Sequence, residues 1–141
     1  MSVRIRPHVT LVHDVTNIDV RSASLENVAA QRPAVALQLL NARTWGPPGY
    51  GIYLAVSDIR RDIENLRRSL SVAHSDHAQF VPHVTLSHPR TVPHTRALEA
   101  WSELATWSID ETVTVDAISL IESESDGGVW RTVITMPLRG T

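Results

Sequence analysis

Two histidine–threonine pairs in near-identical surroundings are the residues of this chain whose types and spacing best suit catalysis. The segment PHVTLVH at residues 7–13 recurs as PHVTLSH at residues 82–88, with six of the seven positions identical. Residues i and i+2 of a β-strand project from the same face, so we expect His8 beside Thr10 and His83 beside Thr85. The chain therefore carries two copies of one imidazole–hydroxyl pair.

Two imidazoles and two hydroxyls suit hydrolysis at phosphorus. Imidazole titrates near neutrality, so one ring can accept a proton from water while the other donates a proton to the leaving oxygen. The threonine hydroxyls would then hydrogen-bond the non-bridging oxygens. A cyclic phosphate is an apt substrate because ring strain lowers the barrier, and no metal Lewis acid is required. The sequence has neither cysteine nor lysine, which excludes thiol nucleophiles, thiolate metal sites and Schiff-base chemistry.

The elements that must position these pairs recur in the same order after each copy. Apolar spacing, prolines and turn residues predict a helix over 22–31, strands over 34–43 and 50–56, a helix from Ser57 or Asp58 to Leu70, a helix over 93–107, and strands over 112–121 and 129–136. Turns are expected at 45–49 and 125–128. Strands in pairs between helices favour an α+β fold with antiparallel sheets.

This order of elements indicates how the pairs meet. Residues of the motif strands that alternate with histidine and threonine, such as Val9 and Leu86, are expected to pack under helices. Pseudo-twofold packing of the halves then brings the two His–Thr pairs together. The whole chain, residues 1–141, is expected to form one domain with pseudo-symmetric halves of about 1–56 and 57–141.

The paired PHVTL segments at 7–11 and 82–86 resemble the paired His-x-Thr signature of the 2H phosphoesterase superfamily. One such tripeptide would mean little. Two in matching context, separated by a helix, a hairpin and a helix, extend the resemblance over essentially the whole chain. Within the superfamily the chain is most similar to cyclic phosphodiesterases and bacterial 2′-5′ RNA ligase-like proteins.

The resemblance implies a bilobal, duplicated α+β fold with antiparallel sheets around a central cleft and helices outside. It implies that His8 and His83 are the catalytic acid and base, that Thr10 and Thr85 bind phosphate, and that no metal or other cofactor takes part. The implied reaction opens a 2′,3′-cyclic phosphate of a nucleotide or RNA end, or ADP-ribose 1″,2″-cyclic phosphate. The product is a phosphomonoester with the phosphate on the 2′ oxygen.

One difference from the superfamily precedes the first motif. Such proteins usually begin with a strand and a helix, whereas only residues 1–6 precede Pro7 here. Either the true start lies upstream, or this is a compact form in which that strand–helix unit is missing. Two other functions stay open on the sequence alone. One is a nucleotide- or RNA-binding module that keeps the cleft but performs no chemistry. The other is a hydrolase of cyclic oligonucleotide signals.

Other side chains near the motifs are secondary candidates. His13 and His88 follow the motif histidines at an offset of five, which places them on the opposite strand face. A bulge after Leu86 would turn His88 inward as a substrate contact. The spacing of the nearby histidines is irregular and lacks carboxylate or thiolate partners, which argues against zinc; they are His74, His77, His83, His88 and His94.

Arginine and aromatic residues near the motif and hairpin ends are further candidates for substrate contacts. The arginines that are able to contact phosphate are Arg4, Arg6, Arg43 and Arg90. The aromatic residues that are able to stack on a base are Trp45, Tyr50 and Tyr53. We expect Trp45 to be exposed in its loop and Tyr53 to pack in the core, together with three further residues, Trp101, Trp107 and Trp130.

Composition limits the partners and the compartment. With 15 acidic and 13 basic residues the net charge is −2, which lacks the basic surplus needed to grip double-stranded DNA. The expected partner is a small nucleotide or an RNA terminus. No apolar stretch is long enough to span a membrane, and residues 1–6 do not read as a signal peptide. These features and the lack of cysteine predict a cytoplasmic protein.

Overall fold

Three helices and six strands make up the described part of the chain. The computed structural model describes residues 6–12, 18–70, 80–123 and 130–140, with only the backbone at 18–23 and 123. In order the elements are α1 (Ile18–Gln31), β1 (Val35–Thr44), β2 (Ile52–Ser57), α2 (Asp62–Leu70), β3 (His83–Ser87), α3 (His94–Leu104), β4 (Glu111–Val115), β5 (Ala117–Ser123) and β6 (Trp130–Pro137). The α+β class with antiparallel pairing is confirmed.

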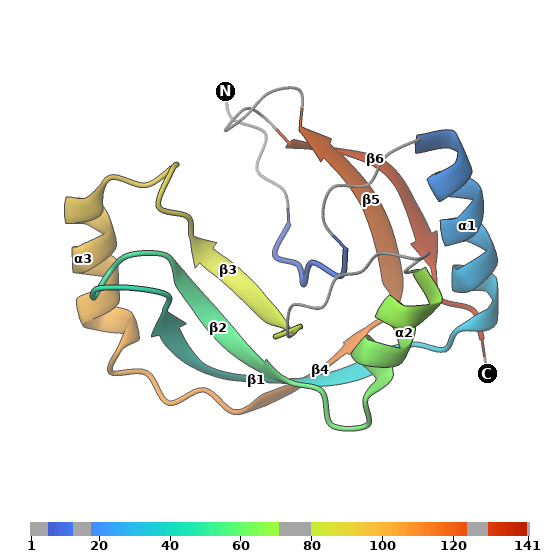
Figure 1. The fold of residues 1–141 in the computed structure, drawn as a ribbon. Helices are drawn as coiled ribbons and strands as arrows, with labels where there is room; N and C mark the ends of the chain where they lie inside the picture. Colours follow the sequence, from blue (N-terminus) through green and yellow to red (C-terminus); the bar gives the residue numbers. More distant parts are fainter. Residues whose placement is uncertain (1–5, 13–17, 71–79, 124–129, 141) are drawn as a thin grey trace.

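The strands form two separate sheets. One has four strands in the order β3-β2-β1-β4, and the other is the β5–β6 hairpin. Figure 1 shows the larger sheet as a curled surface with α3 beside one end and α1 beside the β5–β6 hairpin at the other. None of the helices in the described ranges is long and apolar enough to cross a membrane.

The predicted β1–β2 hairpin is confirmed, and glycines shape its turn. Gly49 and Gly51 adopt φ values of 84° and 65°, which glycine reaches without steric cost. The backbone N–H of Trp45 donates to the carbonyl of Gly51 over 3.2 Å and closes the loop. In the resulting register Arg43 pairs with Tyr53, so both side chains project from one face of the sheet.

The single strand predicted over 112–121 is wrong, because two strands in different sheets occupy this range. β4 pairs with β1, whereas β5 pairs with β6, and Asp116 lies between them. The carbonyl of Asp116 accepts a hydrogen bond from the N–H of Leu138 over 2.8 Å, which ties the crossing to the end of β6. The predicted turn at 125–128 lies outside the described residues.

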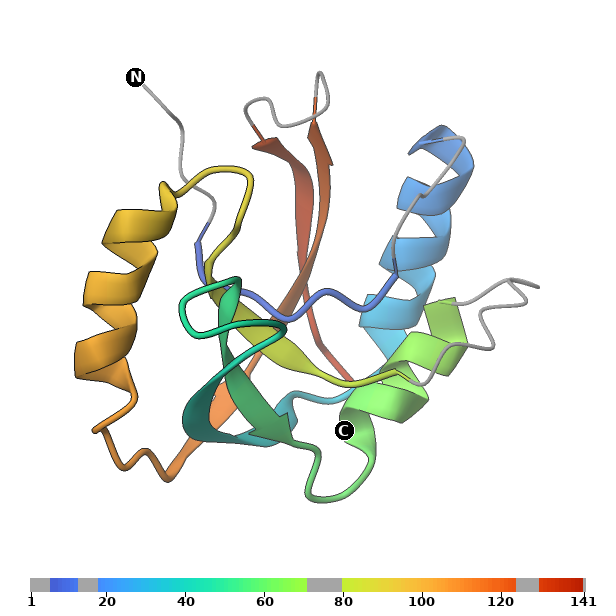
Figure 2. The same ribbon diagram turned by 60° about the vertical axis from the view of Figure 1, so that its left-hand side comes forward.

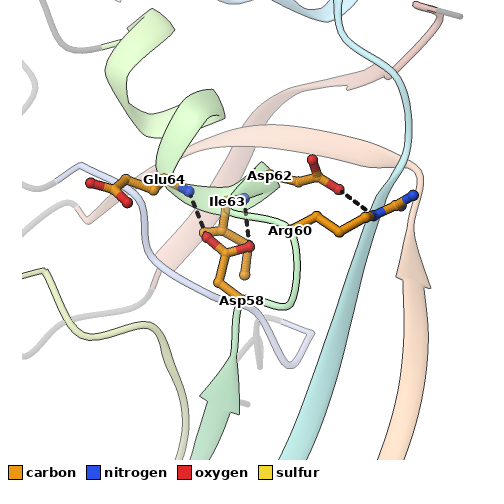
Figure 3. Close-up of polar contacts among 5 residues, drawn as sticks. All are labelled: Asp58, Arg60, Asp62, Ile63 and Glu64. Carbon is orange, nitrogen blue, oxygen red and sulfur yellow. Dashed lines mark hydrogen bonds and ion pairs between the residues drawn. The ribbon is translucent and has the colours of Figure 1, made fainter.

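Helix α2 begins later than predicted but is capped by the residue that the sequence indicated. Asp58 does not start the helix. Its carboxylate oxygens accept hydrogen bonds from the N–H groups of Ile63 (3.1 Å) and Glu64 (3.0 Å), as Figure 3 shows. Arg60 pairs with Asp62 at 3.3 Å in the same turn. A side-chain acceptor at this position satisfies N–H groups that the first turn leaves without partners.

The other two helices also differ from their predicted bounds. Helix α1 starts at Ile18, four residues ahead of the predicted start at 22, and ends at Gln31 as expected. Helix α3 covers 94–104 instead of 93–107, and Pro93 precedes it as the cap residue. The assignment of Trp107 and Trp130 to the core is wrong, because these side chains are 49% and 46% exposed.

The main core lies where α1 and α2 meet the β5–β6 hairpin and the start of β1. Its buried members include Leu25, Val28, Leu37 and Ile118. Val9 packs against this cluster, so the apolar face of the first motif segment points inward as predicted. Burial of these apolar side chains attaches the motif segment to the scaffold through packing.

Candidate functional site

The two motif segments lie side by side and antiparallel. A bridge pairs Val9 of the first segment with Val84 of β3. Figure 2 shows the backbone of residues 6–12 running beside β3. The second segment is a regular strand, but the first is not, because its strand pairing consists of this isolated bridge. The prediction of a motif strand is therefore confirmed for His83–Ser87 and wrong for residues 7–11.

This bridge fixes the arrangement of the four motif side chains. In an antiparallel pair centred on Val9 and Val84, His8 stands opposite Thr85, and Thr10 stands opposite His83. Alternate residues of a strand point to opposite faces, so His83 and Thr85 project from the face of β3 that Val84 does not use. In a regular antiparallel ladder with this pairing, His8 and His83 would be diagonal neighbours, a relation that places Cα atoms about 7–8 Å apart.

Each motif imidazole makes the same local hydrogen bond. His8 Nδ1 is 2.9 Å from the carbonyl oxygen of Arg6, and His83 Nδ1 is 2.9 Å from the carbonyl oxygen of Val81. A carbonyl oxygen only accepts, so each Nδ1 carries the proton. In the neutral form of either ring, Nε2 is then the nitrogen without a proton. The repeat thus reproduces the orientation and tautomer of the imidazole as well as its sequence.

The four side chains remain open to solvent to different degrees. His8 and Thr85 are exposed, whereas Thr10 and His83 are half-buried. None of them is sealed beneath packed side chains, so a ligand has a route to both rings. Val9 and Val84 form part of the apolar side of the motif pair, and Val84 is only 8% exposed.

His83 differs from His8 in having two aromatic neighbours from the β1–β2 hairpin. The rings of Trp45 and Tyr53 stack with centroids 4.3 Å apart and an interplanar angle of 29°. The imidazole of His83 meets them nearly edge-on, at centroid distances of 4.9 Å from Trp45 and 5.6 Å from Tyr53. Trp45 is 49% exposed, which confirms its predicted exposure. Tyr53 is half-buried against Trp45 on the His83 side of the sheet.

A cavity of about 1170 Å³ lies mainly on the apolar side of the motif pair. Its walls include Leu54, Val84 and Val113 from the larger sheet and Trp130 from β6, together with residues of the first motif such as His8. The described residues His83 and Thr85 do not line it. His8 and Thr10 of the first motif therefore border this cavity, whereas His83 and Thr85 of the second motif do not.

Of the secondary candidates, His88 lies just after β3. His88 is exposed, and its Nδ1 accepts a hydrogen bond from the N–H of Arg90 over 3.1 Å, which holds the ring against its own loop. The strand irregularity expected at Leu86 is present, since Tyr53 pairs with Thr85 but the next pair skips a residue. Leu86 is 43% exposed, so its predicted place under a helix is wrong.

Some of the sequence candidates cannot be placed. His13, His74, His77 and Arg4 lie outside the described residues. Within the described ranges, no group of three or more histidine or carboxylate side chains gathers to hold a metal ion.

Sequence reasoning missed the contact between Trp45 and His83. The two residues are 38 positions apart, and nothing in their spacing links them. The usable signal was the cluster WGPPGYG, whose glycines permit a tight loop that returns an aromatic side chain over the sheet.

Comparisons with known proteins agree with this geometry. The family model of the 2′-5′ RNA ligase superfamily matches residues 1–127. No curated protein matches the chain. Among solved structures, TT0787 of Thermus thermophilus is 17% identical, with a TM-score of 0.60 over 96% of this chain and 79% of that one. A structure described as a phosphoesterase is 19% identical, with a TM-score of 0.61 over 94% and 77%.

Escherichia coli LigT is also similar in fold. Its complex with NADP⁺ is 22% identical to this chain, with a TM-score of 0.58 over 94% of this chain and 76% of LigT. Its complex with 3′-AMP is 20% identical, with a TM-score of 0.58 over 94% and 75%. These likenesses confirm the predicted fold. The chain belongs to the 2′-5′ RNA ligase superfamily and has the 2H phosphoesterase fold that its paired His-x-Thr segments indicated.

Proposed function

We propose that the protein is a metal-independent phosphodiesterase that hydrolyses a cyclic phosphate by acid–base catalysis with His8 and His83. The observation that carries this proposal is the equivalence of the two imidazoles. Each donates its Nδ1 proton to a backbone carbonyl 2.9 Å away, and the Val9–Val84 bridge brings the two motif segments side by side. Thr10 and Thr85 are the proposed phosphate ligands on the same face.

The chemistry follows from the placement of two Nε2 atoms around one phosphorus. One neutral ring accepts a proton at Nε2 from water, whose oxygen then forms a bond to phosphorus. The other ring, protonated at Nε2, donates that proton to the ribose oxygen as its bond to phosphorus breaks. The product is a phosphomonoester. The Nδ1–carbonyl bonds stabilise either ring when it is doubly protonated, because the donor proton at Nδ1 is retained.

Threonine hydroxyls at this position act on the charge that develops in the reaction. A hydroxyl donates one hydrogen bond, and non-bridging phosphoryl oxygens gain negative charge during the displacement. Because Thr85 stands opposite His8 and Thr10 opposite His83, each imidazole has a hydroxyl from the other segment beside it. One hydroxyl therefore lies on either side of the proposed phosphoryl position.

A nucleotide or RNA end is the proposed carrier of the cyclic phosphate. The similar fold of E. coli LigT has been crystallised with NADP⁺, with phosphate and with 3′-AMP, which supports a nucleotide-sized ligand. The proposed substrates are nucleoside or RNA 2′,3′-cyclic phosphates, or ADP-ribose 1″,2″-cyclic phosphate. The proposed product carries the phosphate on the 2′ oxygen.

Hydrolysis of the four nucleoside 2′,3′-cyclic phosphates in EDTA tests the proposal. We expect turnover that chelation does not change, with the product regiochemistry assigned by ³¹P NMR. His8→Ala and His83→Ala should each abolish turnover, whereas His94→Ala at the exposed start of α3 is the matched control. Turnover of none of these substrates or of ADP-ribose 1″,2″-cyclic phosphate would contradict the proposal, as would turnover lost on chelation.

The same experiment separates the rival functions. A nucleotide-binding module without chemistry would bind these compounds and lose affinity in the two histidine variants while turning over none of them. A hydrolase of cyclic oligonucleotide signals would cleave a panel of cyclic dinucleotides and leave the 2′,3′-cyclic phosphates intact.

A further inference from the structure

The two motif copies are alike at the imidazoles and differ in what lies beside them. Within the described residues, His83 makes ring contacts with Trp45 and Tyr53, whereas His8 makes no such contact. Tyr53 occupies one face of the Trp45 indole by stacking. The indole remains 49% exposed, so part of its surface is open to solvent beside His83.

The backbone of the hairpin is built to keep the indole in this place. Gly51 adopts a φ of 65°, which L side chains rarely take. A Cβ at this position would lie 2.7 Å from Cε3 of Trp45, closer than packed atoms allow. Gly51 therefore packs closely against the indole of Trp45, and Tyr53 stacks on the same ring. Such a preorganised ring loses little entropy when a ligand stacks on it.

Arg43 extends the same face beyond the aromatic pair. Strand register aligns Thr85 of β3 with Tyr53 of β2, and Tyr53 with Arg43 of β1. His8 stands opposite Thr85 at the other end of this row. Adjacent strands are about 4.8 Å apart, so the Cα of Arg43 lies roughly 10 Å from that of Thr85.

Arg43 is exposed, and its register with Tyr53 puts its side chain on the same face of the sheet as this row. Three of the other exposed arginines form ion pairs: Arg60 with Asp62, Arg68 with Glu64 and Arg131 with Glu122. In the described part of the chain, Arg43 forms neither an ion pair nor a side-chain hydrogen bond. A planar guanidinium matches a phosphoryl group through two parallel hydrogen bonds.

We propose that Trp45 and Arg43 form a nucleotide-recognition subsite beside the His–Thr cluster, in which the indole stacks on the base of the substrate and the guanidinium binds a second phosphoryl group. The inference rests on the proposed function, because it takes the reacting phosphate to lie between His8 and His83. The preferred substrate is then a nucleotide with a cyclic phosphate at one end of its ribose and a 5′-phosphoryl group at the other.

The kinetic test compares adenosine 2′,3′-cyclic phosphate with its 5′-phosphorylated form. We expect the 5′-phosphoryl group to lower KM about tenfold in the wild type, the factor of one charge-assisted hydrogen bond at a partly exposed site. Arg43→Gln should remove this preference, so that the two substrates have similar KM values in the variant. Arg43→Lys should restore part of it. The matched control is Arg139→Gln, an exposed arginine beyond β6.

The base contact is tested with Trp45 variants. Trp45→Ala should raise KM for the adenosine substrate roughly 5- to 100-fold, the range for loss of one stacked base. Trp45→Phe should recover most of this loss. Methyl ribofuranoside 2′,3′-cyclic phosphate, which has no base, should show the same KM with all three proteins. Trp107→Ala is the matched control, because that side chain is also 49% exposed.

Binding measurements keep this inference separate from the proposed function. Adenosine 2′,5′-bisphosphate should bind the wild type about tenfold more tightly than 2′-AMP in calorimetry, and Arg43→Gln should abolish the difference. That result would support the subsite even if no substrate turned over, in which case the proposed function fails alone. Equal affinity for both ligands in the wild type, or equal losses for both in Arg43→Gln, would overturn the subsite even with normal turnover.

Discussion

The first and second motif segments have the same sequence core but different structural support. Residues 83–87 form a strand that pairs with β2, whereas residues 6–12 join the sheet through the Val9–Val84 bridge. Both imidazoles nevertheless make the same hydrogen bond to the carbonyl two residues earlier. The orientation of each imidazole therefore depends on the motif itself and does not require a complete strand.

The difference between the copies lies in the surroundings. The β1–β2 hairpin places Trp45 and Tyr53 beside His83. His8 is exposed and borders the apolar cavity. In the proposed mechanism, the duplicated residues supply what the two sides of a phosphoryl group have in common, and the unduplicated residues distinguish one side from the other. The following predictions test this division, beginning with the shared part.

Loss of either imidazole should have the largest effect. We expect His8→Ala and His83→Ala each to lower kcat by about 10²–10⁴, because each removes one proton transfer. The double variant should be little worse than either single variant, since the rings act as a unit. Steady-state rates with a 2′,3′-cyclic nucleotide measure this. Full activity in one of the two variants would show that the copies are not equivalent.

The threonines should come next. Thr10→Val and Thr85→Val preserve shape and remove the hydroxyl, and each should lower kcat about 10²-fold if it stabilises charge on the phosphoryl oxygens. Thr10→Ser and Thr85→Ser should retain most of the activity, which separates loss of the donor from loss of packing. A change in KM alone, with kcat intact, would assign the hydroxyls to ground-state binding.

The pH dependence of the rate tests shared proton transfer. Activity needs one ring neutral and the other protonated, so kcat/KM should fall at low pH, where both rings are protonated, and at high pH, where both are neutral. The two limbs report the pair and not either histidine singly. Each single histidine variant should lose one limb in its residual rate. A flat profile between pH 5 and 8 would contradict the mechanism.

The smallest predicted effect is on stability, and it comes from a substitution beside the second motif only. Gly51→Ala forces a side chain into a φ of 65° and against Trp45, and should lower the free energy of unfolding by about 1–3 kcal/mol. Gly46→Ala is the control, since its Cβ would meet only the flexible side chain of Tyr50. Urea denaturation compares the two variants. Equal stability in both would show that Gly51 is not under steric constraint.

The sequence predicts the parts of this fold that depend on local pattern. The β1–β2 hairpin and the cap at Asp58 follow from turn residues and from an acceptor ahead of an apolar stripe, and both are present. The shared face of His83 with Thr85 follows from strand geometry, since both lie in β3. The family followed from the repeat of these residues in matching context.

The remaining features depend on pairing between distant segments. The range 112–121 looks like one strand because its β-branched residues continue across Asp116, and only tertiary pairing divides it between two sheets. Exposure of Trp107 likewise depends on what surrounds α3. The contact between Trp45 and His83 requires the register of three strands, which no local pattern contains.

The lone bridge at Val9 has a consequence for how ligands bind. A segment attached by so few backbone hydrogen bonds opens locally at a lower free-energy cost than a strand within a ladder. A ligand that contacts both imidazoles acts as an additional crosslink between the segments. Bound ligand should therefore slow amide hydrogen exchange at residues 8–10 far more than within β3. In that case the ligand itself completes the proposed reaction centre by holding the two segments together.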